Sequence, residues 1–596
     1  MFSHKQRKGA TTFIFLGEFS VTLLPVETSN IRGRSDKIQF EMKKLNFDIL
    51  VRNGRVIDGA GNPWFKADIG ISNDKIEKIG AIEGAAAAKC IEASGLIVCP
   101  GFIDIHNHSD TTILTYPKCD SMIMQGVTTQ VIGNCGNSAA PVKDVNRTNV
   151  QTPDGVPIDW HTFDQYLSKV EKQGVSTNIA SLVGHGTIRL AVMGWEARAP
   201  TKGELEEMKK FVAESMEDGA FGLSTGLAYT PGAWADTDEI VQLCKIAAEY
   251  GGYYATHIRY HGWKERLASK EAIEIGKKAG IQVVISHLET HYPAWGTEEW
   301  IVQGIDEARS EGYDVTCDIT PELWGGTGLL TLIPEKYHEG GHSKVAERLK
   351  NPRIRREIVK EVAEEIRIWP TRSLAADGEW DKFMVTRITK NTDLLGKSLA
   401  EIAKMKGKEP YEAVFDLLME EERPPGVLYL GHLESDMQKL LKHHTSMIES
   451  DGRCIAPYGP EGIGKSHPHP RYYGVFPLVF RKYVRGETRA DMPEEVGNKI
   501  LTWEEAVRKM TSLPAQSGHI QDRGLLRAGM YADIVIFNPD TITDKATYKN
   551  PHQFPEGIPY VIVNGQIAVE NSVHTGALPG KVLRGLGYRK KAHAKK

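Results

Sequence analysis

Two histidines, His106 and His108, close an apolar stretch made of residues 95–98 and 102–105. This stretch predicts a buried strand. Side chains on a strand alternate between its faces, so histidines two residues apart lie on one face, about 6–7 Å apart. Two imidazoles that converge in this way can share a divalent ion such as zinc. A bare His-x-His is also common in solvated loops, so the pair needs further ligands before it indicates a metal site.

Further reactive side chains stand at the ends of other apolar stretches: Cys135, His257, His287 and Asp451. Each has an ordinary structural explanation when taken alone. A buried histidine is usually hydrogen-bonded within the core, a buried cysteine acts as a small hydrophobe, and an aspartate before glycine is typical of a turn. Their joint occurrence at successive predicted strand ends favours one site that holds a pair of divalent ions.

The segments that must position these residues alternate between strands and helices. The sequence predicts strands over residues 220–224, 253–257, 282–287 and 313–318, and helices over residues 201–217, 236–250, 271–279 and 298–310. Thr201-x-x-Glu204 is a capping-box signature at the start of the first of these helices. This alternation is typical of an α/β fold with a parallel sheet, and the chain is long enough for a (β/α)8 TIM-like barrel. The carboxyl ends of barrel strands converge on one mouth, where such folds place their chemistry.

Both ends of the chain are rich in strand-like segments. Asn53-Gly54, Asn73-Asp74 and Asn564-Gly565 lie between apolar runs and signal tight hairpins. We therefore expect a small β-sandwich domain built from both chain ends, residues 46–104 and 515–585, beside a catalytic barrel over residues 105–514. The predicted accessory segments are a poorly ordered N-terminal extension (1–45), a helical insertion (about 335–425) and a basic tail (586–596).

Composition narrows the range of partners and compartments. The 73 lysines and arginines nearly balance the 77 aspartates and glutamates, so neither a nucleic acid nor an acidic membrane surface is an expected partner. No apolar run approaches the ~20 residues that a membrane span needs. The seven cysteines are dispersed without paired spacing, which fits a reducing cytoplasm where a thiolate is free to hold metal.

At these residues the chain resembles the amidohydrolase superfamily and, within it, the N-acyl-D-amino-acid deacylases, or D-aminoacylases. The resemblance runs from about residue 47 to residue 584. Its ordered motifs lie at residues 100–108, 126–136, 184–187, 222–229, 256–259, 285–287, 450–452 and 469–471. The number and order of these matches are specific for the family and less so for the substrate.

The resemblance implies a binuclear metal centre in which a cysteine replaces the bridging carbamylated lysine of many relatives, and Cys135 stands at that place. One tightly bound zinc would be held by Cys135, His257 and His287. A second, weaker divalent ion would be held by Cys135 together with His106 and His108.

The resemblance also implies the reaction, which is hydrolysis of a linear amide by a metal-activated water. Asp451 matches the catalytic aspartate, acting first as general base and then as general acid. Tyr229 is similar to a tyrosine of the family that contacts the substrate. The expected substrate is a small or peptide-like molecule, such as an N-acyl-D-amino acid or a peptide with a D-residue, and the oligomeric state stays open.

Recognition of a substrate carboxylate departs from the family pattern. Arg471 matches the expected arginine, but Glu289 stands where the family has a lysine, and Thr320 and Glu322 replace two tyrosines. An unpaired Glu289 would repel a carboxylate at 4 Å by about 4 kcal/mol at an effective dielectric constant of 20. One hypothesis is therefore a leaving group that is neutral or cationic near Glu289.

The alternative hypothesis is that a nearby cation, Lys264 or Arg259, neutralises Glu289 and that the carboxylate still binds Arg471. Two other classes of function compete with the linear amide hydrolase. One is a cyclic-amide hydrolase of the hydantoinase or dihydroorotase type, which usually bridges its metals with a carbamylated lysine rather than a cysteine. The other is a non-catalytic amidohydrolase-like scaffold, against which the full set of expected ligands argues.

Overall fold

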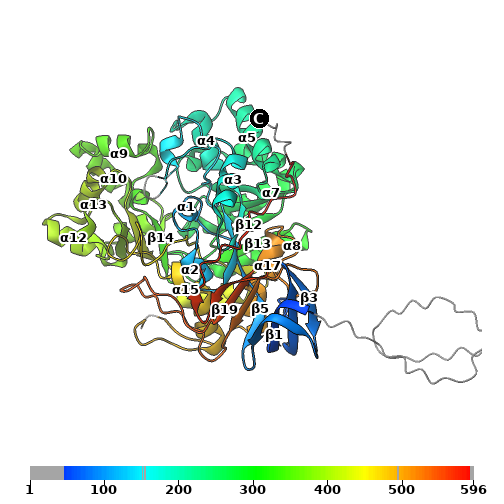
Figure 1. Cartoon of the computed structure of the whole chain (residues 1–596). Helices are drawn as coiled ribbons and strands as arrows, with labels where there is room; N and C mark the ends of the chain where they lie inside the picture. The colour runs from blue at the N-terminus through cyan, green and yellow to red at the C-terminus, as the bar shows by residue number, and fades with distance from the viewer. Residues whose placement is uncertain (1–45, 151, 153–155, 493–494, 591–596) are drawn as a thin grey trace, which may run out of the picture. The chain divides into compact units, whose positions relative to one another are not determined.

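The computed structural model describes residues 46–150, 152, 156–492 and 495–590 (Figure 1). The predicted N-terminal extension and most of the predicted basic tail lie outside these residues. Among the described helices, none combines the length and the apolar character needed to cross a membrane.

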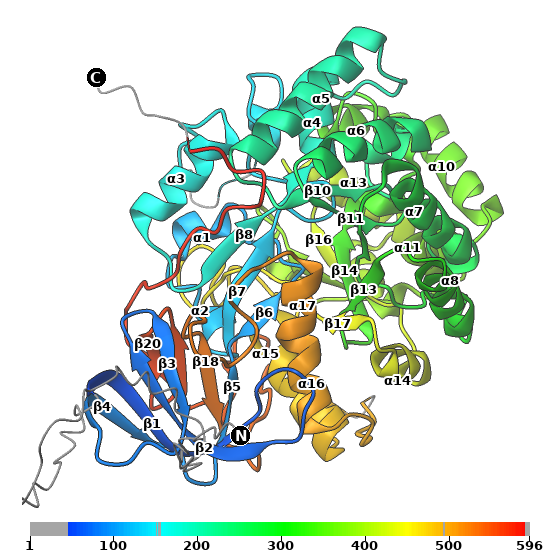
Figure 2. The same ribbon diagram turned by 90° about the vertical axis from the view of Figure 1, so that its right-hand side faces the viewer.

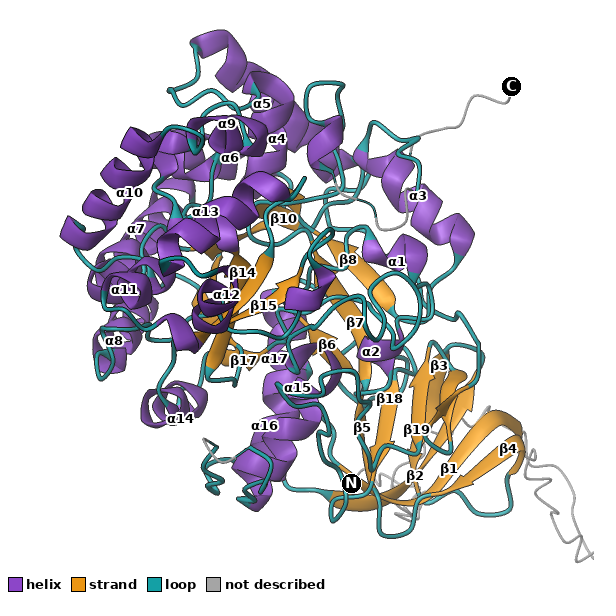
Figure 3. Cartoon of the chain, turned by 90° about the vertical axis from the view of Figure 1, so that its left-hand side faces the viewer, coloured by secondary structure: helices purple, strands orange, loops and turns teal. Residues whose placement is uncertain are grey.

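Parallel strands at the centre of the chain form the predicted (β/α)8 barrel (Figures 2 and 3). They are β6 (Phe102–Asp104), β7 (Val127–Ile132), β8 (Asn178–Ser181), β9 (Val183–Gly184), β10 (Gly222–Gly226), β11 (Tyr253–His257), β12 (Val283–Ile285), β13 (Val315–Ile319) and β17 (Ser446–Ile448). Only Leu182 separates β8 from β9, so these two share one of the eight positions. A parallel bridge between Asn107 and Gly452 links the ends of the first and last strands. The fold prediction is confirmed.

Helices pack around the barrel and bury apolar side chains against it. The main ones are α3 (Phe163–Gln173), α4 (His185–Met193), α5 (Lys202–Glu217), α6 (Thr237–Glu249), α7 (Glu265–Ala279), α8 (Glu298–Ser310), α14 (Glu434–Lys442), α15 (Arg471–Val479), α16 (Trp503–Met510) and α17 (Ser512–Ser517). On α5 the buried stripe includes Met208, Val212 and Met216. The capping box of Thr201 and Glu204 is formed at its start, as the sequence predicts.

A nine-stranded sheet joins the two ends of the described chain, in the order β21-β20-β19-β18-β5-β1-β2-β3 with β4 paired to β1. Its strands are β1 (Asn46–Val56), β2 (Phe65–Ser72), β3 (Lys75–Gly80), β4 (Ala86–Glu92), β5 (Ile97–Pro100), β18 (Ile534–Phe537), β19 (Tyr560–Val563), β20 (Gln566–Glu570) and β21 (Val573–His574). Asn73 and Asn564 adopt left-handed turns between adjacent strands. The Asn53-Gly54 hairpin prediction is wrong, because this pair lies inside β1 at a break in register with β2.

The apolar stretch before His106 is two strands rather than one. β5 belongs to the nine-stranded sheet and β6 to the barrel, with Gly101 between them. A Cβ at Gly101 would lie 2.1 Å from the Thr128 hydroxyl oxygen, so only glycine fits at this crossing.

A second hydrophobic core lies beside the barrel mouth, in the segment between β13 and β17. It contains the helices α9 (His342–Arg348), α10 (Pro352–Glu364), α11 (Pro370–Ala376), α12 (Leu399–Lys406) and α13 (Pro410–Glu420). The same segment also forms a three-stranded antiparallel sheet, from β14 (Trp324–Gly328), β15 (Phe383–Arg387) and β16 (Gly426–Leu430). The sequence indicates the helices but not these strands.

Candidate functional site

Ligand-type side chains from separate barrel strands converge on the thiol of Cys135. Its Sγ lies 3.3 Å from His106 Nε2, 3.5 Å from His287 Nε2 and 3.9 Å from His257 Nδ1. His257 Nδ1 and His287 Nε2 are 2.8 Å apart. All four side chains are buried. The sequence-predicted cluster therefore comes together at the carboxyl ends of β6, β7, β11 and β12.

This arrangement fits a metal ion. Zinc binds nitrogen at about 2.0–2.1 Å and sulfur at about 2.3 Å, so tetrahedral ligand atoms stand roughly 3.3–3.6 Å apart. The distances from Cys135 Sγ lie in or near that range. A thiolate with imidazoles is also a donor set that zinc prefers.

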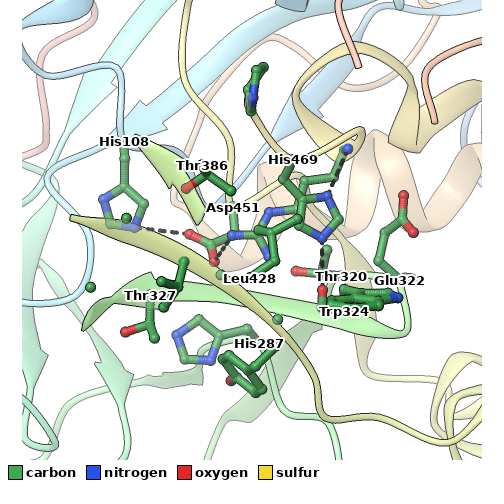
Figure 4. A pocket seen from close by; sticks show the side chains of 18 of the residues that line it. His108, His287, Thr320, Glu322, Trp324, Thr327, Thr386, Leu428, Asp451 and His469 are labelled. Atoms are coloured by element: carbon green, nitrogen blue, oxygen red, sulfur yellow. Dashed lines mark hydrogen bonds and ion pairs between the residues drawn. The ribbon is translucent and has the colours of Figure 1, made fainter. Parts of the chain in front are cut away.

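A second group is formed by His106, His108 and Asp451. His108 Nε2 lies 3.0 Å from Asp451 Oδ1, and His106 Nε2 lies 3.8 Å from the same oxygen. These ligand atoms all fall within 4.8 Å of one another. In Figure 4 a dashed line joins Asp451 to His108. The sequence predicts one site for all these residues, and the structure brings them together.

Asp318 on β13 lies close to two of the histidines. Its Oδ1 accepts a 2.5 Å hydrogen bond from the backbone N–H of His287 and lies 3.6 Å from His106 Nδ1. A carboxylate facing Nδ1 favours a proton on that nitrogen and leaves Nε2, the atom facing Cys135, as the ligand.

The backbone at the site is held in an unusual conformation. Cys135, His287 and Asp451 have φ angles of 51°, 35° and 39°, in the left-handed region that non-glycine residues rarely adopt. Such residues cost about 1–3 kcal/mol each and concentrate at functional sites. Neighbouring glycine makes the tight packing feasible, because a Cβ at Gly136 would lie 2.8 Å from the Gly226 nitrogen.

The surroundings set the charge of each key group. Burial opposes ionisation of Cys135, but the surrounding imidazoles, His106 first among them, hold the pKa of its thiol well below the usual range. Burial also opposes ionisation of Asp451, yet the Arg471 guanidinium and the His108 ring hold its pKa well below the usual range. Burial and the neighbouring His287 lower the pKa of His257 to about 4. The site therefore offers a thiolate, a carboxylate and a neutral imidazole at neutral pH.

A cavity of about 320 Å³ opens from this cluster. The small antiparallel sheet forms one wall, with Thr327 and Leu428 among the lining residues (Figure 4). Tyr229 lines the cavity, and its hydroxyl lies 3.4 Å from Thr327 Oγ1. Arg471 also lines it but holds Asp451 Oδ2 at 2.5 Å. Its guanidinium thus supports the aspartate that faces the histidines.

Glu289 is buried in the cavity wall, and its surroundings weaken the repulsion of a substrate carboxylate that the sequence predicts. Its Oε1 accepts a 2.6 Å hydrogen bond from the backbone N–H of Thr320. Burial raises the pKa of Glu289 to about 8, against the opposing effect of His287. A largely neutral carboxyl at pH 7 does not exert the repulsion of a full charge.

The prediction that Lys264 or Arg259 neutralises Glu289 is wrong. Arg259 is bound by both carboxylate oxygens of Glu271, at 2.9 Å and 3.1 Å from its Nε. Lys264 lies over the ring of Tyr260. Both side chains are therefore engaged elsewhere.

Further buried side chains continue outward from the cluster, and sequence reasoning missed them. His261 Nε2 lies 3.0 Å from His257 Nε2, and His261 Nδ1 lies 3.7 Å from Glu265 Oε1. That oxygen also lies 3.0 Å from His291 Nδ1, and the His291 ring packs against His432. The sequence signal that could have indicated them is spacing, because His261 and His291 each stand four residues after a predicted metal ligand.

Comparison with known proteins settles the family. The sequence profile described as "Amidohydrolase family" matches residues 89–569. The chain belongs to the amidohydrolase family. This membership confirms the predicted enzyme class, a metal-dependent amidohydrolase.

Three proteins are similar to this amidohydrolase over most of its length. It is 34% identical to an N-acyl-D-glutamate deacylase of Alcaligenes xylosoxydans xylosoxydans over 540 residues, covering 90% of the chain and 96% of that protein. It is also 34% identical to a D-aminoacylase of the same organism, covering 90% and 97%. A crystal structure of the N-acyl-D-glutamate deacylase from Bordetella bronchiseptica, complexed with zinc and a phosphonate inhibitor that mimics the tetrahedral intermediate, matches with a TM-score of 0.74. That match has 31% identity and covers 90% of this chain and 100% of that one.

Proposed function

We propose that this amidohydrolase cleaves the linear amide bond of N-acyl-D-amino acids or of related peptide-like substrates with a D-residue. The observation that carries the proposal is the Cys135 thiolate at 3.3–3.9 Å from three imidazole nitrogens, with Asp451 beside the same group. The relatives named as D-aminoacylase and N-acyl-D-glutamate deacylase support the substrate class.

The metal ligands are proposed by position. Cys135, His257 and His287 would hold one tightly bound zinc, while His106 and His108 with Cys135 would hold a second, weaker divalent ion. When bound, zinc lowers the pKa of a coordinated water from 15.7 to about 7 and so supplies hydroxide at neutral pH.

The side chains then divide the work of proton transfer and orientation. Asp451 accepts the proton of the attacking water and returns it to the leaving nitrogen. Arg471 keeps Asp451 ionised and oriented. Burial raises the pKa of Tyr229, so its hydroxyl stays protonated and can donate a hydrogen bond to the substrate carbonyl oxygen.

His261 is expected to tune zinc affinity without touching the ion. Nδ1 of His257 faces the Cys135 thiol, so the Nε2–H of His257 donates to His261 Nε2 at 3.0 Å. This hydrogen bond fixes the tautomer and the orientation of the His257 ring. Replacing His261 with alanine should weaken zinc binding by about 10–100-fold. Competition with a fluorescent chelator measures this change. His552→Ala, a histidine hydrogen-bonded to Tyr473 at another place, serves as control, and equal affinity in wild type and His261→Ala would exclude the role.

The charge state of Glu289 predicts a pH-dependent substrate preference. Above pH 8, on protein carrying one equivalent of zinc, N-acetyl-D-methionine carboxamide should be hydrolysed with a higher kcat/KM than the free acid. Burial raises the pKa of Glu289 to about 8, so its carboxyl group is mostly an anion above pH 8. The anion repels the carboxylate of the free acid more strongly at that pH. A repulsion of about 1.4 kcal/mol gives a tenfold difference. Faster cleavage of the free acid at pH 9 would contradict this preference for neutral or cationic leaving groups.

We also propose roles for the larger parts of the chain. Residues 105–514 would be the catalytic unit, and the 335–425 segment with its adjoining strands would shape the substrate cavity. The lining residues Thr327, Thr386 and Leu428 support this division. The seven cysteines, all within the described residues, are free thiols, which supports the cytoplasm as the place of action.

A further inference from the structure

A group of potential ligands distinct from the Cys135 cluster lines the same cavity. Glu289, His291 and His432 are buried, with exposed fractions of 3%, 3% and 7%. One ligand atom of each lies within 4.8 Å of those of the other two. The three residues come from the segment after β12 and the segment after β16, so only the fold brings them together.

Hydrogen bonds fix which nitrogen of each histidine is available. His291 Nδ1 lies 3.0 Å from Glu265 Oε1, and a carboxylate accepts, so Nδ1 carries the proton. His432 Nδ1 lies 3.4 Å from the carbonyl oxygen of Thr290, which can also only accept. In each neutral ring the lone pair is then on Nε2. Two imidazoles with Nδ1–H held by an acceptor and Nε2 free have the arrangement of metal-ligating histidines.

Glu289 adds an oxygen ligand. Its Oε1 accepts from the Thr320 N–H at 2.6 Å, which fixes the carboxyl group. Within the part of the chain that the structure describes, no lysine or arginine forms a salt bridge with Glu289. The carboxyl group therefore has acceptor capacity for a cation in the cavity.

We propose that Glu289, His291 and His432 form an additional binding site for a divalent transition-metal ion. Two histidines and one glutamate are a ligand set of catalytic zinc sites, which keep at least one position open. Here the open position would face the cavity. Such an ion would place a positive charge where Glu289 faces the substrate. This consequence for the substrate rests on the proposed hydrolase function, whereas metal binding itself does not.

Cobalt titration of the full chain tests the site, because Co²⁺ replaces zinc and is coloured. Ions bound to Cys135 show a thiolate-to-metal charge-transfer band in the near ultraviolet. An ion bound to Glu289, His291 and His432 adds visible ligand-field absorption without that band. We expect wild-type protein to bind one equivalent more than His432→Gln, with the same charge-transfer intensity in both. The control is His338→Gln, a buried histidine hydrogen-bonded to Thr230, which should bind as many equivalents as wild type.

If wild type and His432→Gln bind equal numbers of cobalt equivalents, the proposal is overturned, and Glu289, His291 and His432 form only a polar network. If His432→Gln does not fold, Glu289→Gln is the second variant and must show the same loss of one equivalent. Anomalous diffraction from cobalt-treated wild-type crystals gives an independent answer. A peak among the three side chains supports the site, and its absence when the Cys135 site is filled overturns it. Cys135→Ser separates this result from the proposed function, because it should abolish the charge-transfer band but retain the extra equivalent.

Discussion

Replacing Asp451 with asparagine is expected to lower kcat by about 10²–10⁴-fold, the usual contribution of a positioned general acid–base group. Asparagine has nearly the same shape, so the left-handed backbone at this position, with φ of 39°, can be kept. Its amide cannot accept the proton of the attacking water. The loss should therefore appear in kcat measured on an N-acyl-D-amino acid, while the content of tightly bound zinc stays at the wild-type level.

A matched control for this substitution is available in the same chain. Asp522 is also an aspartate with a left-handed backbone, φ 57°, and lies outside the candidate site. Asp522→Asn should keep wild-type kcat. If Asp451→Asn kept more than a tenth of the wild-type kcat, Asp451 would not be the proton acceptor.

Replacing Cys135 with alanine is expected to remove the tightly bound zinc and nearly all activity. The thiol stands closest to the centre of the ligand group, within 3.3–3.9 Å of nitrogens from three histidines. Loss of an outer-shell partner costs roughly 10–100-fold in metal affinity, and loss of a direct ligand should exceed that range. Without the thiolate, the imidazoles also lack the anion that offsets the charge of a divalent ion.

Metal analysis after dialysis, together with kcat/KM, measures the effect of Cys135→Ala. Cys317→Ala is the control, because Cys317 is also buried, lies on β13 and takes no part in the ligand group. It should retain zinc and activity. Stoichiometric zinc in Cys135→Ala would show that the histidines suffice and that the thiolate is not a required ligand.

The Cys135 cluster could be predicted because its members stand at the ends of separate strands. Strand β11 has the predicted bounds, Tyr253–His257, and its last residue points a ligand into the barrel mouth. In a parallel barrel, an apolar stretch that ends in a histidine already fixes the direction and the location of that side chain. Local sequence and global fold agree at these positions.

The remaining features depend on tertiary contacts that no local pattern encodes. β14 contains three glycines in five residues, which is typical of a loop, yet it pairs with β16 along its length. His432 lies in a segment after β16 without a periodic signal, and only the fold places it beside His291. The charge state of Glu289 likewise follows from burial, which the sequence does not display.

The pairing of β5 with β18 has a consequence for biosynthesis. The apolar strand β5 leaves the ribosome before the barrel strands, whereas its partner, Ile534–Phe537, emerges only after them. Until then one edge of β5 has unsatisfied backbone groups and is open to pairing with other nascent chains. Messages that terminate before β18 should therefore yield aggregating products, even when the complete barrel has been translated.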